Sequence, residues 1–208
     1  PWRKRCMEHW HDLVTEKSWK LLQQLKGKFK FILIGGWAVY LLARTQKSKD
    51  VDIIVDMVTL QKLKSSYDLR KNDALRKYEI KADQVDIDIY IPFYSKLAIA
   101  LENVESQKIE GFDVAKPEEL LILKQGAELD RRHSEKGEKD RIDIMSLLLN
   151  CAVDWKRYRK LLNENKLEGN IVELLGLVRG FNEYKYFGMP PSEFKRKKQK
   201  LVDEIRKL

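Results

Sequence analysis

Two segments in the first half of the chain alternate apolar and acidic residues, which is the pattern of a β-strand with one buried face. In the first segment, Asp50 and Asp52 share a face, while the valine and isoleucine residues between and after them turn to the core. In the second segment, Asp86 and Asp88 share a face in the same way. We therefore predict two strands that each present carboxylates on one side.

A pair of glycines lies ahead of the first acidic strand. Residues 31–34 form a short apolar run, residues 37–43 have the character of an apolar helix, and Gly35 and Gly36 lie between them. Because glycine has no Cβ, a polyphosphate can approach its main chain, and the N–H groups of a helix start can hold the anion. The pattern predicts a phosphate-binding turn, although a Gly-Gly after a strand is often only a tight turn.

If the two acidic strands are neighbours, their carboxylates converge. Like charges at close range repel one another unless a cation lies between them, and hard oxygen ligands suit Mg²⁺. Two such ions about 3.5–4 Å apart can activate an attacking oxygen and stabilise a leaving phosphate, which is the chemistry of nucleotidyl transfer. The alternative is an acidic strand face that is merely solvated. Asp56 ends the first strand, and we expect it to cap the helix that begins near Thr59.

Helical periodicity dominates the rest of the chain. We expect helices over residues 10–26, 60–67, 142–149, 155–163 and 171–178, and further helices that begin at Pro117 and Ser192. Extended segments are expected at residues 78–80, 104–109 and 112–114. This order predicts an α+β fold. We expect a catalytic core with an N-terminal helix in residues 1–115, a helical domain in 116–187, and a linker with a basic helix in 188–208.

Composition limits the class of protein. With 208 residues and 43% hydrophobic content, the chain can bury a core of its own. Its two cysteines, Cys6 and Cys151, are too few for a disulfide framework or a zinc site. No apolar stretch approaches the roughly 20 residues that a membrane span requires. We expect a cytoplasmic protein that does not enter a membrane.

The chain carries an excess of positive charge, with a formal net charge of +9 at pH 7. Residues 195–200 contain five of the 41 lysine and arginine residues, and four of these five are lysines. Such a surface attracts polyanions, so nucleic acid is an expected partner class. The basic segment either follows a phosphate backbone or serves as a solubilising tail, and the sequence leaves both interpretations open.

At the glycine pair and the acidic strands, the sequence resembles the nucleotidyltransferases of the DNA polymerase beta type. Their pattern is an apolar strand, Gly-Gly or Gly-Ser, a helix, Asp-x-Asp on the next strand and a third acid on a later strand. Residues 33–38, the Asp50-Val51-Asp52 triplet and the strand around Asp88 match it. The resemblance implies a core of a mixed sheet with flanking helices, followed by a helical bundle.

This resemblance also implies roles for individual residues. Gly35 and Gly36 would contact the triphosphate, and Asp50 and Asp52 would bind metal and act in catalysis. Asp88 would be the third catalytic carboxylate and metal ligand, because it directly precedes what looks like the end of the family's strand, with Asp86 as the alternative.

Within the superfamily, the chain is most similar to the AbiEii-like abortive-infection toxin nucleotidyltransferases and uncharacterised prokaryotic relatives. Those relatives carry a Lys, an Arg and a Lys-Asp-x-x-Asp pattern in a helical segment after the core. The resemblance implies that Lys124 and Lys139 bind phosphate and that Asp140 is a polar partner or a base. Lys124 suits a helix surface equally well, and Lys139 and Asp140 also suit a solvated helix face.

The expected function is therefore Mg²⁺-dependent transfer of NMP from a nucleoside triphosphate to an acceptor hydroxyl, with two Mg²⁺ ions. The resemblance allows tRNA ends, proteins or small molecules as acceptors, and the basic charge favours RNA. A toxin-like type would bring an antitoxin protein as a partner. One alternative is an aminoglycoside-like small-molecule nucleotidyltransferase, which acids such as Glu118, Glu119 or Glu128 at a cleft wall would favour. The other is a catalytically inactive relative that binds nucleic acid or a partner.

Overall fold

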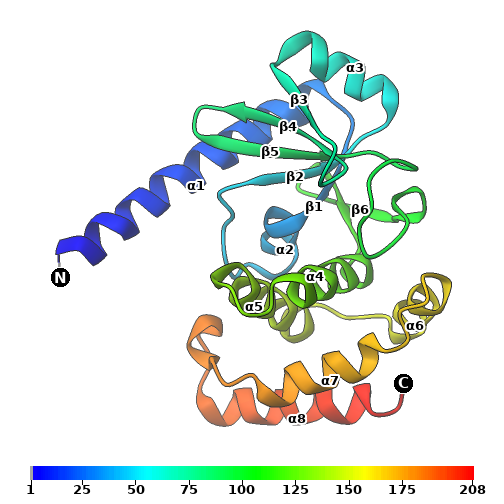
Figure 1. The fold of residues 1–208 in the computed structure, drawn as a ribbon. Coiled ribbons are helices and arrows are strands. Elements are labelled where there is room, and N and C mark those ends of the chain that lie inside the picture. Colours follow the sequence, from blue (N-terminus) through cyan, green and yellow to red (C-terminus); the bar gives the residue numbers. More distant parts are fainter. Residues whose placement is uncertain (1) are drawn as a thin grey trace. The chain divides into compact units, whose positions relative to one another are not determined.

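The computed structural model describes the backbone of residues 2–208 and the side chains from Leu13 onward (Figure 1). The chain forms two compact units. The first contains the residues up to Leu41 together with Gln46–Lys96 and Ala100–Ala115, and the second contains Leu42–Thr45, Leu97–Ile99 and Lys116–Leu208.

A seven-stranded mixed sheet forms the centre of the first unit, in the order β3-β4-β5-β2-β1-β7-β6. Its strands are β1 (Ile32–Ile34), β2 (Val51–Ile54), β3 (Leu69–Asn72), β4 (Lys77–Ala82), β5 (Val85–Tyr90), β6 (Ser106–Ile109) and β7 (Phe112–Ala115). β2 is antiparallel to β1 and parallel to β5. The two acidic strands are therefore neighbours, and the apolar residues that alternate with the acids, such as Val51 and Ile87, are fully buried.

The first unit contains the helices α1 (Trp2–Lys28) and α3 (Met57–Ser66), a short 3₁₀ turn, η1 (Leu101–Asn103), and α2 (Gly35–Ala43) as far as Leu41. α1 packs on α2 through Trp19 and Trp37, whose ring centroids are 5.0 Å apart, and Trp37 donates a hydrogen bond to the Ser18 hydroxyl at 2.7 Å. Asp56 caps α3 as predicted, because its Oδ1 accepts a hydrogen bond from the Thr59 N–H at 2.6 Å.

The second unit is helical. It consists of α4 (Pro117–Arg131), α5 (Glu135–Asn150), α6 (Trp155–Glu164), α7 (Asn170–Gly180), η2 (Tyr184–Phe187) and α8 (Pro191–Ile205). α7 and α8 lie side by side (Figure 1). The last helix, α8, buries the apolar side chains of Phe194, Leu201, Val202 and Ile205. None of the helices that the structure describes combines the length and apolar content of a membrane span.

The α+β fold class is confirmed, but one strand was not expected and one helix begins earlier than expected. β3 was not expected, because its sequence Leu-Arg-Lys-Asn has no buried alternation and it forms the edge of the sheet. α5 begins at Glu135 rather than near Ile142. Its charged first turns hide the helical periodicity, but Ser134 caps it by accepting a hydrogen bond from the Gly137 N–H at 3.1 Å.

Candidate active site

Acidic side chains from β2 and β5 share one side of the sheet. Asp52 and Asp88 are direct partners in the parallel register of these strands. Neighbouring strands lie about 4.8 Å apart, and residues directly opposite one another point to the same side. Asp50 lies two residues before Asp52 and is exposed, whereas Asp52 and Asp88 are partly buried. We call Asp50, Asp52 and Asp88 the carboxylate row.

The main chain of Gly35 touches the carboxylate row. Gly35 has a φ of +68°, and a Cβ at this position would lie 2.0 Å from Asp52 Oδ2 and 2.6 Å from Asp52 Cγ. No other residue type fits there without displacing the carboxylate. Gly35 also begins α2, and Gly36 is buried in the first turn. The glycine turn expected from the sequence therefore lies directly against the first acidic strand.

A lysine holds the third carboxylate of the row. Lys77 Nζ lies 2.7 Å from Asp88 Oδ2 and 3.0 Å from Glu79 Oε1, and its side chain is only 12% exposed. Glu79 is the direct partner of Asp88 across β4 and β5, and it also accepts a hydrogen bond from Asn72 Nδ2 at 2.9 Å. Lys77 is not among the site residues predicted from the sequence. The sequence feature that could have indicated Lys77 is the alternation along β4, where Lys77 and Glu79 share one face and the buried Ile80 lies on the other.

Electrostatics distinguish the two partners of this ion pair. Burial raises the pKa of the Asp88 carboxyl and the charges of Glu79 and Asp50 raise it further, while Lys77 opposes them. Burial lowers the pKa of Lys77, but its contacts with Asp88 and Glu79 outweigh burial, so the net shift is upward. Lys77 is therefore a firmly protonated ammonium that offsets negative charge at this end of the row.

Asp86, the alternative third ligand, has different surroundings. It is exposed, and its carboxylate lies 4.0 Å from the ammonium of Lys81, which is exposed too. Lys81 is its direct partner in the register of β4 and β5. Asp88 differs because it is partly buried and lies directly opposite Asp52 in the register of β2 and β5.

The chemistry of the row suits a hard cation at Asp50 and Asp52. Their carboxylate oxygens are the donors that Mg²⁺ prefers, and Gly35 leaves room for the Asp52 carboxylate. Among the residues whose side chains are described, no three acidic, histidine or cysteine side chains are gathered as a ready-made metal cluster. The carboxylates share a side of the sheet, but Asp88 turns to Lys77 rather than to a common centre.

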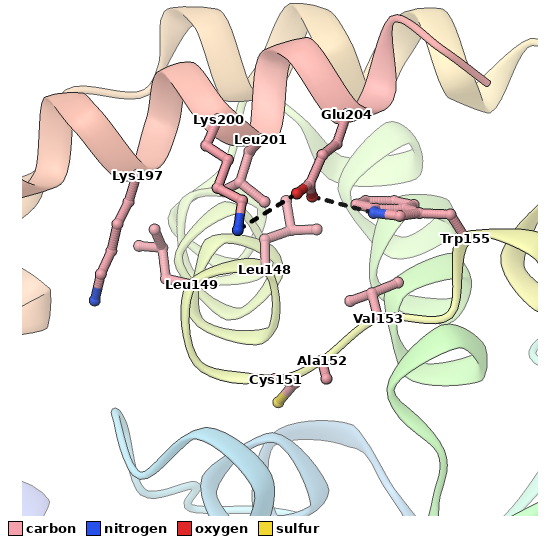
Figure 2. A pocket seen from close by; sticks show the side chains of 10 residues that line it. All are labelled: Leu148, Leu149, Cys151, Ala152, Val153, Trp155, Lys197, Lys200, Leu201 and Glu204. Carbon is pink, nitrogen blue, oxygen red and sulfur yellow. Dashed lines mark hydrogen bonds and ion pairs between the residues drawn. The ribbon is translucent and has the colours of Figure 1, made fainter.

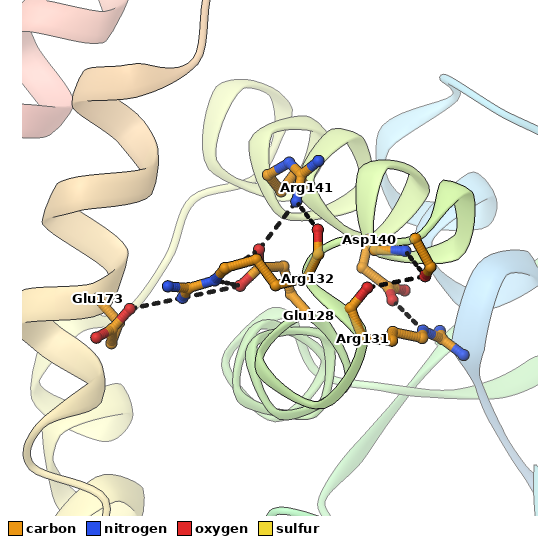
Figure 3. Close-up of polar contacts among 8 residues, drawn as sticks. Glu128, Arg131, Arg132, Asp140, Arg141 and Glu173 are labelled. Atoms are coloured by element: carbon orange, nitrogen blue, oxygen red, sulfur yellow. Dashed lines mark hydrogen bonds and ion pairs between the residues drawn. The ribbon is translucent and has the colours of Figure 1, made fainter.

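Lys124 and Asp140 form internal ion pairs in the second unit. Lys124 Nζ lies 2.7 Å from Asp143 Oδ2 and 3.2 Å from Asp140 Oδ1. Arg131 Nε donates a hydrogen bond to Asp140 Oδ2 at 2.7 Å (Figure 3). All three members of the Lys124 cluster, defined as Lys124, Asp140 and Asp143, are buried, while Lys139 is partly exposed. A role for these residues at a nucleotide stays a prediction.

The acids that would receive a cationic small molecule are also buried and paired. Glu128 is held by Arg132 and Arg141, and Arg132 also reaches Glu173 at 2.6 Å (Figure 3). Two more acids near the start of α4 have partners: Glu118 accepts a hydrogen bond from the Asp154 N–H, and Glu119 pairs with Arg157. These carboxylates join α4 to α5, α6 and α7.

A hollow of about 530 Å³ lies within the second unit. Apolar side chains such as Leu148 and Leu201 line it together with charged side chains of α8. Trp155 Nε1 donates a hydrogen bond to Glu204, which also pairs with Lys200 at 3.7 Å (Figure 2). Cys151 lines it as well, and burial raises the pKa of this thiol to about 11. The thiol is therefore protonated at neutral pH and is a poor nucleophile. We assign no reaction to this hollow.

The fold of the chain is similar to that of a solved nucleotidyltransferase-like structure. A candidate nucleotidyltransferase from Helicobacter pylori has 18% identity to the chain, with a TM-score of 0.50, and the match covers 94% of this chain and 96% of that one. A further neighbour is the H. pylori protein JHP933, with 17% identity and a TM-score of 0.46; the match covers 95% of this chain and 92% of that one. Another is an antigenic nucleotidyltransferase-like protein from Paracoccidioides brasiliensis, with 18% identity and a TM-score of 0.44; the match covers 86% of this chain and 98% of that one.

No family model and no curated protein matches the chain. At the identities found, the solved structures support the fold alone. The AbiEii-like subgroup and an antitoxin partner therefore stay predictions from the sequence.

Proposed function

We propose that the protein transfers a nucleoside monophosphate from a nucleoside triphosphate to an acceptor hydroxyl. The observation that carries this proposal is the contact of Gly35 with Asp52, beside Asp88 on the next strand. It brings a helix start without an obstructing side chain to a row of acids. A phosphate and a hard cation need these two features side by side.

Each part of the site has a task in this proposal. The first N–H groups of α2 have no acceptor within the helix, so they can donate to phosphate oxygens at Gly35 and Gly36. Asp50 and Asp52 would hold Mg²⁺, and the bound ion would neutralise charge on the phosphates. The main contribution of the chain is to position the triphosphate beside its carboxylates.

The transfer exchanges one bond for another. The acceptor oxygen forms a bond to the α-phosphorus, while the bond between the α-phosphorus and the bridging oxygen to the β-phosphorus breaks. Pyrophosphate leaves with the electron pair, and the hydroxyl proton passes to a carboxylate of the row. Acceptor, nucleotide and pyrophosphate thus account for every atom.

RNA is the acceptor class that we propose. The net charge of +9 supports it, and so do the exposed cations Lys195, Arg196 and Lys200 on α8. Lys198 is different, because it donates hydrogen bonds to the carbonyls of Arg179 and Phe181 and so caps α7. A cationic small molecule is less well served, since Glu118, Glu119 and Glu128 are buried and already paired.

Labelled nucleoside triphosphates with Mg²⁺ and total tRNA test the proposal. We expect label to be transferred to RNA by the unaltered chain. An Asp50→Ala/Asp52→Ala variant should lose at least about 100-fold in rate, because the charge of the phosphates is no longer offset. Equal labelling by the double variant would contradict the proposal.

A matched pair of variants on β5 identifies the third carboxylate. Asp88→Asn should lose transfer to a similar extent, because Asp88 lies beside Asp52. Asp86→Asn should retain it, since Asp86 is exposed and paired only with Lys81 among its described ion pairs. The reverse result would assign the role to Asp86.

A further inference from the structure

We propose that Lys77 is a built-in counter-cation of Asp88 that competes with divalent cations for the carboxylate row. This inference rests on the proposed function only in taking the row as the cation site. In this role Lys77 is a positioning residue, because it acts through Asp88. It keeps the third carboxylate neutralised until a divalent cation arrives, and so sets the cation affinity of the row.

The contacts of Lys77 carry this inference. Its ammonium lies 2.7 Å from Asp88 and 3.0 Å from Glu79, and the side chain is 12% exposed. An ion pair with so little access to water is screened far less than a surface pair. A divalent cation that uses Asp88 as a ligand must therefore displace a strong competitor, or share the carboxylate with it.

Glu79 gives the displaced ammonium a second partner. It lies opposite Asp88 in the register, and Asn72 fixes it by a hydrogen bond at 2.9 Å. Lys77 can give up Asp88 and keep Glu79 without becoming an unpaired charge in a partly buried place, which would be costly. We infer a sequence in which a cation binds first at Asp50 and Asp52, and Asp88 joins when Lys77 turns wholly to Glu79.

The same two strands supply a comparison at the surface. Lys81 on β4 pairs with Asp86 on β5, but at 4.0 Å and with side-chain exposures of 75% and 58%. Residue types and strands are the same, while distance and burial differ. Lys81 therefore serves as the matched control for any effect that comes merely from removing a positive charge near the row.

The experiment is a titration of the full chain with Mn²⁺ alone, in which the free ion is followed by electron paramagnetic resonance. Lys77→Gln should bind Mn²⁺ about tenfold more tightly than the unaltered chain, because an opposite charge next to a carboxylate alters its affinity for a cation by a factor of that order or more. Lys77→Arg keeps the charge and should stay near the original affinity. Lys81→Gln should differ from it by less than about twofold.

Glu79→Gln provides a second variant whose expected effect has the opposite sign. Without Glu79, Lys77 has Asp88 as its remaining partner in this ion-pair group, so Mn²⁺ should bind more weakly. A lysine that only stabilises the sheet would alter the thermal midpoint in both variants but would not move Mn²⁺ affinity in opposite directions. Glu79→Gln also tests the inference if Lys77→Gln does not fold.

The outcomes separate this inference from the proposed function. Tight Mn²⁺ binding by the unaltered chain, with no gain in folded Lys77→Gln or an equal gain in Lys81→Gln, overturns the role of Lys77 alone. If neither the unaltered chain nor Lys77→Gln binds Mn²⁺, both the metal-dependent function and this inference fail.

Discussion

The carboxylate row and the Lys124 cluster both contain aspartates, but these differ in exposure to solvent and in their ion pairs. In the row, Asp50 is exposed, and Asp52 and Asp88 are partly buried beside one another. In the Lys124 cluster, both carboxylates are almost wholly buried, and one ammonium lies within 3.2 Å of each. The row thus consists of three carboxylates, one of them paired with Lys77, whereas the cluster is buried and Arg131 adds a second cation at Asp140.

Under the proposed function, this difference separates a cation site from a buried cluster that holds two helices together. Charges that repel one another cost stability, so they persist where function needs them. Charges buried with their partners are costly only when one partner is removed. The two regions should therefore respond in opposite ways to the loss of a charge, and the substitutions of Lys124 and Asp50 described below test that expectation.

The largest effect is expected for Lys124→Met. The change leaves Asp140 and Asp143 buried without their ammonium, and breaking a buried ion pair in this way costs about 3–5 kcal/mol. Arg131 still reaches Asp140, so most of the loss should come from Asp143. Urea denaturation of the variant and of the unaltered chain measures the difference in the free energy of unfolding.

Lys136→Met is the control for this prediction, because Lys136 is exposed on the same helix as Asp140. It should change stability by less than about 0.5 kcal/mol. If Lys124→Met is as stable as the control but needs far more nucleoside triphosphate for half-maximal transfer, Lys124 binds phosphate and the contrast between the two regions is wrong.

The second effect concerns Gly35→Ala. An alanine would have to adopt a φ of +68°, and its Cβ would overlap the Asp52 carboxylate. Backbone strain of this kind costs about 1–3 kcal/mol, and the displaced carboxylate would also weaken Mn²⁺ binding. Thermal unfolding and Mn²⁺ titration measure both. Gly27→Ala, where a Cβ meets nothing within 4 Å, should show neither loss.

Much of the row could be predicted from the sequence, because it depends on local regularities. Alternation in residues 50–56 and 84–92 determines which side chains share a face, and a strand followed by two glycines indicates the turn. The pairing of β2 with β5 places Asp52 beside Asp88. Alternation alone could not show that these two strands are neighbours.

Contacts between distant residues could not be predicted. Lys77 contacts Asp88 because β4 and β5 pair in a particular antiparallel register. A shift of this register by one residue would place the Lys77 side chain on the other face of the sheet from Asp88. Likewise, Lys124 and Asp143 lie on different helices and meet through the antiparallel packing of α4 and α5. Charge-rich helical sequences suggest solvated faces, and only packing shows which charges are buried.

A smaller effect is expected for Asp56→Ala, at the end of the same strand that carries Asp50. The Thr59 backbone N–H, and then the Thr59 hydroxyl, hold the pKa of Asp56 below its ordinary value. A lowered pKa stabilises the fold at pH values above the ordinary pKa, and this stabilisation is lost as the pH falls through the lowered value. At pH 7 the variant should lose about 1 kcal/mol, and the loss should shrink in acid.

Asp56→Asn separates the charge of this cap from its hydrogen bond. The amide oxygen still accepts from the Thr59 N–H, so the variant should remain close to the unaltered chain at pH 7 and show no loss of the cap in acid. Neither variant should alter Mn²⁺ binding, because Asp56 serves α3 rather than the carboxylate row. A loss of Mn²⁺ affinity in Asp56→Asn would extend the row by one residue.

The smallest effect on stability is expected for Asp50→Asn, and it tests the contrast most directly. Asp50 is exposed and raises the pKa of Asp88, which means that the two carboxylates repel one another. Removing its charge should raise the free energy of unfolding slightly, by up to about 0.5 kcal/mol, while Mn²⁺ binding falls. Urea denaturation and Mn²⁺ titration of one preparation give both quantities. A clear loss of stability would make Asp50 a structural residue like those of the Lys124 cluster, because a carboxylate kept for cation binding should not be needed for folding.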